Sequence, residues 1–125
     1  MIRKNLLIIG HSPGPGVVSN RKTSTLNRVR SWIDEDYTYE WKNLVDYHAP
    51  TLKMSDVNLD ENYVQTFDYI IALGNMASKW LNKKNINHLK VPHPSGLNRM
   101  WNNPQTEIDT VESIKKYLHT TKSVV

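Results

Sequence analysis

Uninterrupted apolar runs alternate along this chain with stretches of helical periodicity. Leu6–Ile9 and Tyr69–Leu73 lack polar alternation, which is typical of strands buried on both faces of a parallel sheet. Tyr37–Val45 alternates at first and is rich in aromatic residues, so we expect a strand there. Leu89–Val91 predicts a short last strand. The pattern therefore indicates four strands.

Three longer helices are expected between and after these strands. Apolar residues spaced by three and by one predict the first over Thr23–Ile33, and the second runs from Met76 to about Lys83. Asn103 has the character of an N-cap and Pro104 that of a first helical residue, so the last helix opens there. The expected apolar stripe of this last helix consists of Ile108, Val111, Ile114 and Leu118.

The order of the elements predicts the fold class. Strands and helices alternate, with a short helix around Leu59–Val64, and this order implies right-handed crossovers. We expect one domain over residues 1–125: an α/β three-layer sandwich whose four-stranded, mainly parallel sheet is flanked by helices. Ligands of such folds bind beyond the carboxyl ends of the strands. Loops 10–16 and 92–97, which contain Gly and Pro, leave their strands at that end.

Composition narrows the class of protein. A chain of 125 residues with 38% hydrophobic and 22% charged residues is typical of a globular domain. The absence of cysteine excludes disulfides, a thiol nucleophile and a cysteine-bound zinc or iron–sulfur centre, and we expect no metal or other cofactor. No apolar run approaches about 18 residues, and the amino terminus lacks a signal-peptide cleavage site. We expect a soluble, intracellular monomer (cytoplasm or nucleoid) without a membrane partner.

The charge balance indicates the kind of partner. Sixteen Lys and Arg residues against 12 Asp and Glu residues give a net charge of +4, with an isoelectric point near 9.3. A basic surface attracts phosphate backbones regardless of sequence. Charge therefore favours a polyanionic partner.

The first loop has the character of a phosphate-binding turn. Gly14 and Gly16 let the backbone approach a ligand closely, and the following helix would present its N-terminus to negative charge. The loop lacks the Gly-Lys-Ser/Thr ending of a Walker loop and the glycine spacing of a dinucleotide fingerprint. By itself it is equally consistent with a tight structural turn.

The second loop, Val91–Arg99, is more specific. His93 stands between two prolines, which hold it on a rigid backbone. Ser95 and Gly96 supply a hydroxyl and an open amide suited to a phosphate, and Arg99 supplies charge. The alternative is a purely structural histidine.

Four segments resemble, in the right order, the uracil-DNA glycosylase superfamily. Gly10–Gly14 resembles its first motif, a Gly-x-x-Pro-Gly loop after the first strand. Asn43–Pro50 resembles the strand and loop of the iron–sulfur uracil glycosylases, and Ile71–Ala77 their third strand and the helix start after it. His93–Leu97 matches the second motif, including its leucine. The resemblance implies the three-layer fold of that superfamily.

The resemblance also implies roles for individual residues. His93 stands where the family histidine donates a hydrogen bond to uracil O2 as charge builds on the departing base. Asn43 stands where an asparagine reads the pyrimidine edge, and Gly10 is the second residue implied in binding the base. Leu97 stands where a wedge enters the base stack. The residues implied in gripping DNA are Pro13, Gly14, Ser95, Gly96, Leu97 and Arg99.

The residue that would handle the attacking water departs from the family pattern. The first motif usually holds an acid or amide there, whereas this chain has His11 and Ser12. His11 can act as a base near neutral pH, and Ser12 can hold a water. No aromatic residue follows between Gly14 and Leu26 to stack on a base.

We therefore expect a DNA glycosylase that hydrolyses the N-glycosidic bond of uracil or a modified pyrimidine flipped out of single- or double-stranded DNA. Two alternatives stay open. The chain could be a non-catalytic module that binds DNA or a base on the same scaffold. It could also be an enzyme of nucleotide or modified-base metabolism that uses the same pocket.

Overall fold

The computed structural model describes residues 4–11, 28–33, 37–47, 49, 51–93 and 103–119. Residues 28–32 are helical. The remaining elements are β1 (Lys4–Gly10), β2 (Tyr37–Asn43), the 3-10 helix η1 (Met54–Asp56), α2 (Glu61–Val64), β3 (Tyr69–Leu73), α3 (Asn75–Lys83), β4 (Leu89–Val91) and α4 (Pro104–Leu118). Within the described residues, no helix is both long and apolar enough to cross a membrane.

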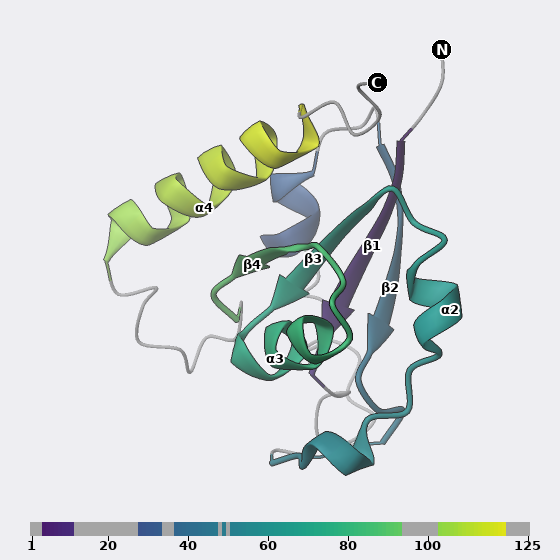
Figure 1. Ribbon diagram of the computed structural model, residues 1–125. Helices are drawn as coiled ribbons and strands as arrows, with labels where there is room; N and C mark the ends of the chain where they lie inside the picture. The colour runs from purple at the N-terminus through teal and green to yellow at the C-terminus, as the bar shows by residue number, and fades with distance from the viewer. Residues whose placement is uncertain are drawn as a thin grey trace.

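The four strands form one sheet in the order β2-β1-β3-β4 (Figure 1). All three neighbouring pairs are parallel. The predicted α/β fold with a four-stranded parallel sheet is therefore confirmed. From β1 the chain adds β2 on one side and then β3 and β4 on the other side. The sheet therefore has a topological switch point between its two central strands, β1 and β3.

Both faces of the sheet are covered at its two central strands, β1 and β3. Leu6–Ile9 is wholly shielded from solvent, and every residue of Tyr69–Leu73 is buried. Leu7 and Ile9 pack in a cluster with residues of α2 and α3. Leu6 and Ile8 pack on the other face, in a cluster with residues of 28–32 and α4. Burial on both faces explains why these two strands lack polar alternation.

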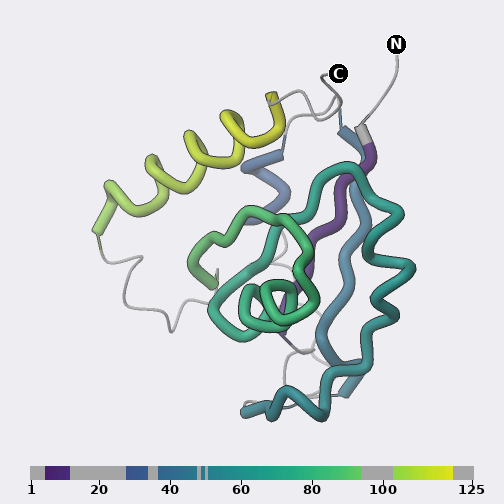
Figure 2. The backbone as a smooth tube through the Cα atoms, in the orientation of Figure 1, coloured from purple at the N-terminus to yellow at the C-terminus, as the bar shows by residue number. Residues whose placement is uncertain are grey.

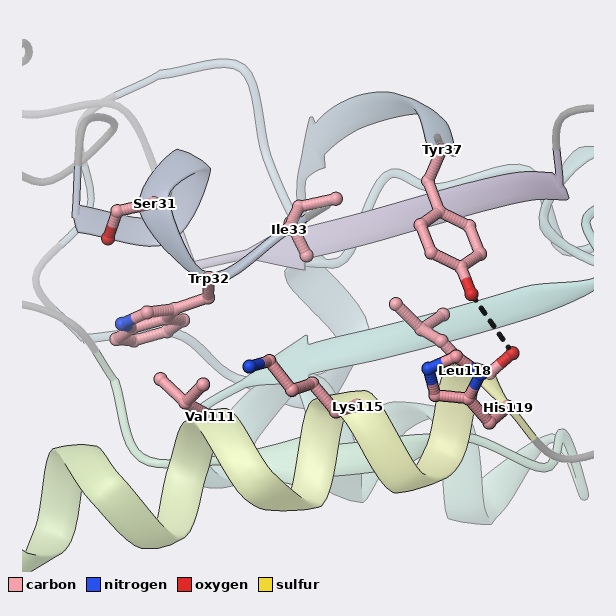
Figure 3. A pocket seen from close by; sticks show the side chains of 8 residues that line it. All are labelled: Ser31, Trp32, Ile33, Tyr37, Val111, Lys115, Leu118 and His119. Carbon is pink, nitrogen blue, oxygen red and sulfur yellow. Dashed lines mark hydrogen bonds between the residues drawn. The ribbon is translucent and has the colours of Figure 1, made fainter. Parts of the chain in front are cut away.

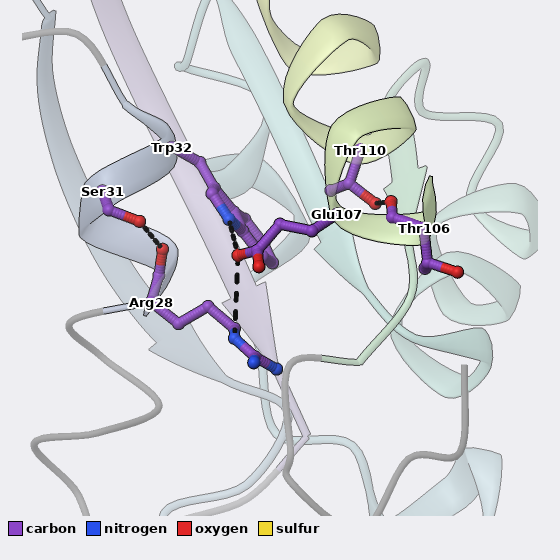
Figure 4. Close-up of polar contacts among 6 residues, drawn as sticks. All are labelled: Arg28, Ser31, Trp32, Thr106, Glu107 and Thr110. Carbon is purple, nitrogen blue, oxygen red and sulfur yellow. Dashed lines mark hydrogen bonds and ion pairs between the residues drawn. The ribbon is translucent and has the colours of Figure 1, made fainter. Parts of the chain in front are cut away.

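Polar contacts join the helix of 28–32 to α4, and the two lie side by side in Figure 2. The indole Nε1 of Trp32 donates to Oε2 of Glu107 at 2.9 Å, and Arg28 Nε lies 3.7 Å from the same oxygen (Figure 4). The Glu107 carboxylate thus accepts a hydrogen bond from a largely buried indole and forms an ion pair with Arg28. These contacts fix the helical layer on that face.

The ends of α3 are defined by two residues with positive φ. Gly74 is the N-cap at φ 95°. Asn85 follows the helix at φ 58°, and Ile86 N donates to Leu81 O at 2.9 Å, the backbone bond that commonly closes a helix in this way. Both ends of α3 are therefore set by local backbone geometry.

The predicted ends of one strand and one helix differ from those in the structure. The strand expected over 37–45 ends at Asn43, because Leu44 turns and its N–H donates to Gly10 O at 3.0 Å and His11 O at 3.1 Å. The helix expected around 59–64 begins at Glu61, where the Asp60 side chain accepts from the amide of Asn62. Of the helix expected over 23–33, positions 23–27 lie outside the described residues.

The apolar stripe expected for α4 is wrong at one position. Ile108 is 50% exposed, whereas Thr110 is buried in its stead. The Thr110 hydroxyl donates to Thr106 O at 2.7 Å, so its polar group is satisfied within the helix (Figure 4). Ile114 and Leu118 are buried as expected. The start of this helix is also confirmed, since Asn103 Oδ1 accepts from Gln105 N.

Candidate functional site

The candidate site lies at the carboxyl edge of the sheet, beyond the switch point. Register places Gly10 of β1 opposite Asn43 of β2, and Leu73 of β3 opposite Val91 of β4. His93 follows β4 by two residues. Three strand spacings separate β2 from β4, about 14 Å in all. The ends of all four strands thus lie along this edge, with β1 and β3 between the two strands that carry Asn43 and lead to His93.

Gly10 and Asn43 are in close contact. A β-carbon built on Gly10 would lie 2.5 Å from Asn43 Oδ1 and 3.2 Å from Trp41 Nε1. No side chain can occupy that space without displacing the amide. Trp41 Nε1 in turn donates to Asn43 Oδ1 at 3.0 Å. The amide of Asn43 is thus held directly above the end of β1.

His11 is anchored by one ring nitrogen. Its Nε2 lies 2.8 Å from the carbonyl oxygen of Ala49. Because a carbonyl only accepts, Nε2 carries the proton and donates it to that oxygen. Among the described residues, Nδ1 makes no hydrogen bond, and no buried side-chain nitrogen or oxygen lacks a partner. Nδ1 is therefore in contact with solvent.

His93 packs against Gly74 at the end of β3. The backbone N–H of Gly74 donates to Val91 O at 2.8 Å, which continues the pairing of β3 with β4 past their last register pair. A β-carbon on Gly74 would lie 3.3 Å from the β-carbon of His93 and 3.5 Å from its Cδ2. The position of the imidazole thus depends on a glycine that also has positive φ.

The charge state of His93 is set by its surroundings. Burial lowers the pKa of the His93 imidazole below its ordinary value, and the positive charge that His11 can carry lowers this pKa further. A histidine with a lowered pKa is neutral at pH 7. A neutral imidazole has one N–H to donate and one lone pair to accept.

The structure thus places four of the predicted site residues, Gly10, His11, Asn43 and His93, at one edge of the sheet. The other predicted residues are outside the described part of the chain, and their roles stay predictions. These are Ser12, Pro13, Gly14, Ser95, Gly96, Leu97 and Arg99.

Two residues of this edge were not predicted from sequence. Trp41 lies two positions before Asn43, and the period of two along a strand places both side chains on one face of β2. Gly74 ends a buried strand, which is a sequence signal for a close backbone approach. Strand periodicity and glycine position could therefore have indicated both.

A separate hollow of about 410 Å³ lies between the helix of 28–32 and α4 (Figure 3). Its polar groups are largely engaged within the fold: Tyr37 Oη donates to Leu118 O at 3.3 Å, and the hydroxyl of Ser31 donates to Arg28 O at 2.6 Å. None of the predicted site residues lines it. We therefore take the carboxyl edge, where four of the predicted residues lie, as the candidate site.

Within the described ranges, no three His, Cys, Asp or Glu side chains gather as metal ligands. Comparisons with protein-family models, with curated proteins and with solved structures find no match.

Proposed function

We propose that this chain is a DNA glycosylase related to the uracil-DNA glycosylase superfamily, which releases uracil or a modified pyrimidine flipped out of DNA. The observation that carries the proposal is the placement of His11, Asn43 and His93 at or just after the ends of three strands, along one carboxyl edge of the sheet, together with the lowered pKa of the His93 imidazole. The motif resemblance assigns functional roles to Asn43 and His93, and His11 stands in the first motif, where the family usually has an acid or amide.

His93 suits the stabilisation of a leaving base. When the bond between sugar and base breaks, its electron pair passes to the base, and negative charge spreads to the ring oxygens. A neutral imidazole packed against Gly74 still has one N–H, which can donate a hydrogen bond to that charge. One donor of this kind is typically worth about 3–4 kcal/mol in the transition state.

His11 suits the activation of water. With Nε2–H committed to Ala49 O, a neutral ring has its lone pair on Nδ1, the nitrogen that solvent reaches. The water oxygen forms the new bond to the sugar C1′, and the water proton passes to Nδ1. In the alternative assignment Ser12 holds the attacking water in place of His11. Ser12 lies outside the described residues.

Asn43 suits the reading of the base, since an amide can donate and accept at the same time. Leu97 as wedge and Pro13, Gly14, Ser95, Gly96 and Arg99 as DNA contacts complete the proposal from the sequence motifs. Release of base from an oligonucleotide with a single uracil, read as alkali-labile strand breaks, tests it. His93→Ala is the variant that should slow this release, by about 10²- to 10³-fold.

One observation favours a second candidate, a module that binds DNA or a base without cleaving it. The bond from His11 to Ala49 O ties the segment after β1 to the segment after β2, which is a sufficient structural role for this histidine. Salt-dependent binding to the same oligonucleotides with no base release would select this candidate.

A further inference from the structure

The hydrogen bond between Trp41 and Asn43 determines which end of the Asn43 amide a ligand can reach. The two side chains lie on the same face of β2, where Trp41 is partly buried against the cluster formed with 28–32 and α4. Trp41 Nε1 lies 3.0 Å from Asn43 Oδ1. The indole is thus a fixed group beside a short, movable amide.

The orientation of this amide follows from the chemistry of the indole. Tryptophan Nε1–H is a donor and never an acceptor. The group that faces it must therefore be the amide oxygen, and the reversed orientation would set two donors against each other. Amide orientations are otherwise open to reversal, because oxygen and nitrogen are so similar in size. Here the indole N–H of Trp41 favours one amide orientation over the other in energy.

Gly10 holds the other side of the same oxygen. The 2.5 Å between Asn43 Oδ1 and a β-carbon built on Gly10 shows that the oxygen lies against the bare backbone of β1. Any side chain at this position would displace the amide from the indole. Trp41 and Gly10 together confine the oxygen.

The nitrogen of the amide is the end left for a ligand. Among the described residues, Asn43 Nδ2 makes no hydrogen bond, and no buried side-chain nitrogen or oxygen there lacks a partner. Nδ2 is therefore in contact with solvent at the carboxyl edge. The oxygen keeps a second lone pair.

We propose that Trp41 is a positioning residue that sets the base selectivity of the site by locking the Asn43 amide. The amide then presents two N–H donors, and one remaining lone pair beside them, to a base with a carbonyl at ring position 4 and an N–H at position 3. A 4-amino pyrimidine such as cytosine has a donor and an acceptor in the reversed order and is rejected. This inference rests on the proposed function.

The test compares the wild-type protein with Trp41→Phe, which keeps a flat apolar ring but removes the donor. Release of uracil and of cytosine is measured from otherwise identical single-stranded oligonucleotides. Freed to rotate, the amide can accept from the 4-amino group, so the ratio of kcat/KM for uracil over cytosine should fall about ten- to a hundredfold. Gly10→Ala, which pushes the amide off the indole, should lower the ratio in the same direction even where Trp41→Phe folds poorly.

Tyr39→Phe is the matched control. Tyr39 lies on the same face of β2, and its hydroxyl accepts from Arg30 Nε at 3.2 Å, away from Asn43. The ratio of kcat/KM for uracil over cytosine in Tyr39→Phe should equal that of the wild type. Uracil release with an unchanged ratio in Trp41→Phe and Gly10→Ala would overturn the positioning role and leave the glycosylase proposal standing.

A second readout separates the two proposals when the wild-type protein releases no base. Free uracil and free cytosine are titrated against ¹⁵N-labelled protein while the Asn43 side-chain amide and Trp41 indole N–H signals are followed. A response to uracil over cytosine that Trp41→Phe loses would support the positioning role in a binding module. An equal response to both bases, or to neither, would overturn it.

Discussion

The imidazole Nε2 of His11 donates a hydrogen bond to the carbonyl oxygen of Ala49 at 2.8 Å. This contact spans 38 positions of sequence and joins the segment after β1 to the segment after β2. It also fixes which ring nitrogen can take a proton, because the carbonyl oxygen can only accept. The tautomer of His11 is thus determined by backbone that lies far away in the sequence.

The first prediction concerns this histidine as the base that activates water. His11→Gln removes the lone pair of Nδ1, and uracil release should fall about 10²- to 10⁴-fold, the usual contribution of a general base. Single-turnover release from a uracil oligonucleotide measures the loss. Ser12→Ala tests the competing assignment, and release by this variant should stay close to wild type if His11 is the base. The reverse result, in which Ser12→Ala is inactive and His11→Gln active, would transfer the role to Ser12.

The second prediction concerns the titration of His93. Its pKa should lie below about 6.5, the ordinary value for histidine, since burial and the positive charge of His11 both disfavour the imidazolium. In His11→Gln the pKa of His93 should rise, yet stay below the ordinary value because burial is the larger cause. NMR titration of the ring protons measures both. No change in the His93 pKa between the two proteins would show that the two rings are not neighbours.

The third prediction is the effect of the His93 titration on stability. Because the pKa of His93 is lower in the folded than in the unfolded state, the unfolded chain binds more protons between these two values. The contribution of His93 is fully present above the unfolded pKa and is lost as pH falls toward the folded pKa. Urea unfolding from pH 7 downward should show the decline, and His93→Gln should show a shallower one. Equal slopes would contradict the lowered pKa.

The fourth prediction concerns Gly74, whose φ of 95° and ψ of 179° lie in a region that side chains disfavour. Gly74→Ala should cost about 1–3 kcal/mol of unfolding free energy. The new methyl group would also press on the His93 ring, so base release should fall beyond what stability explains. Chemical denaturation and base release at a temperature where the variant is folded measure the two effects.

Asn85→Ala is the matched variant for Gly74, since Asn85 also has positive φ and closes the other end of α3. It should lose about 1 kcal/mol of stability through backbone strain. Base release should stay at the wild-type level, because Asn85 lies outside the carboxyl edge. A similar loss of release in both variants would mean that Gly74 acts through stability alone.

The central strands could be predicted from sequence because burial on both faces leaves an uninterrupted apolar run. Tyr69–Leu73 and Leu89–Val91 have the predicted bounds for that reason. The end of β2 was placed two residues late, since Leu44 and Val45 remain apolar and buried after the backbone has left the sheet. Burial continues there, whereas strand pairing does not.

In α4 the predicted apolar stripe is wrong at Ile108, because a hydrophobic residue is not always a buried one. Thr110 is buried with its hydroxyl bonded to the preceding turn, which leaves the larger Ile108 half exposed. A stripe of apolar residues cannot reveal such a substitution. The two helical turns that follow, around Ile114 and Leu118, pack as predicted.

The chemistry of the site was less accessible from sequence than its location. That residues following parallel strands meet at one edge is a property of the fold, so Gly10, Asn43 and His93 could be grouped in advance. The tautomer of His11 depends on Ala49, a partner 38 positions away that no spacing rule identifies. Strand spacing could have placed Trp41 beside Asn43, but the hydrogen bond that orients the amide depends on how the two side chains pack in the folded chain.

The most direct test of the account is base release by the wild-type protein and His93→Ala, from labelled single- and double-stranded oligonucleotides with one uracil. Wild-type protein should release uracil, and the variant should release it about 10²- to 10³-fold more slowly, the usual cost of one lost donor. His119→Ala, which changes an exposed histidine at the end of α4, should match the wild type. Equal release by His93→Ala and the wild type would contradict the assigned chemistry.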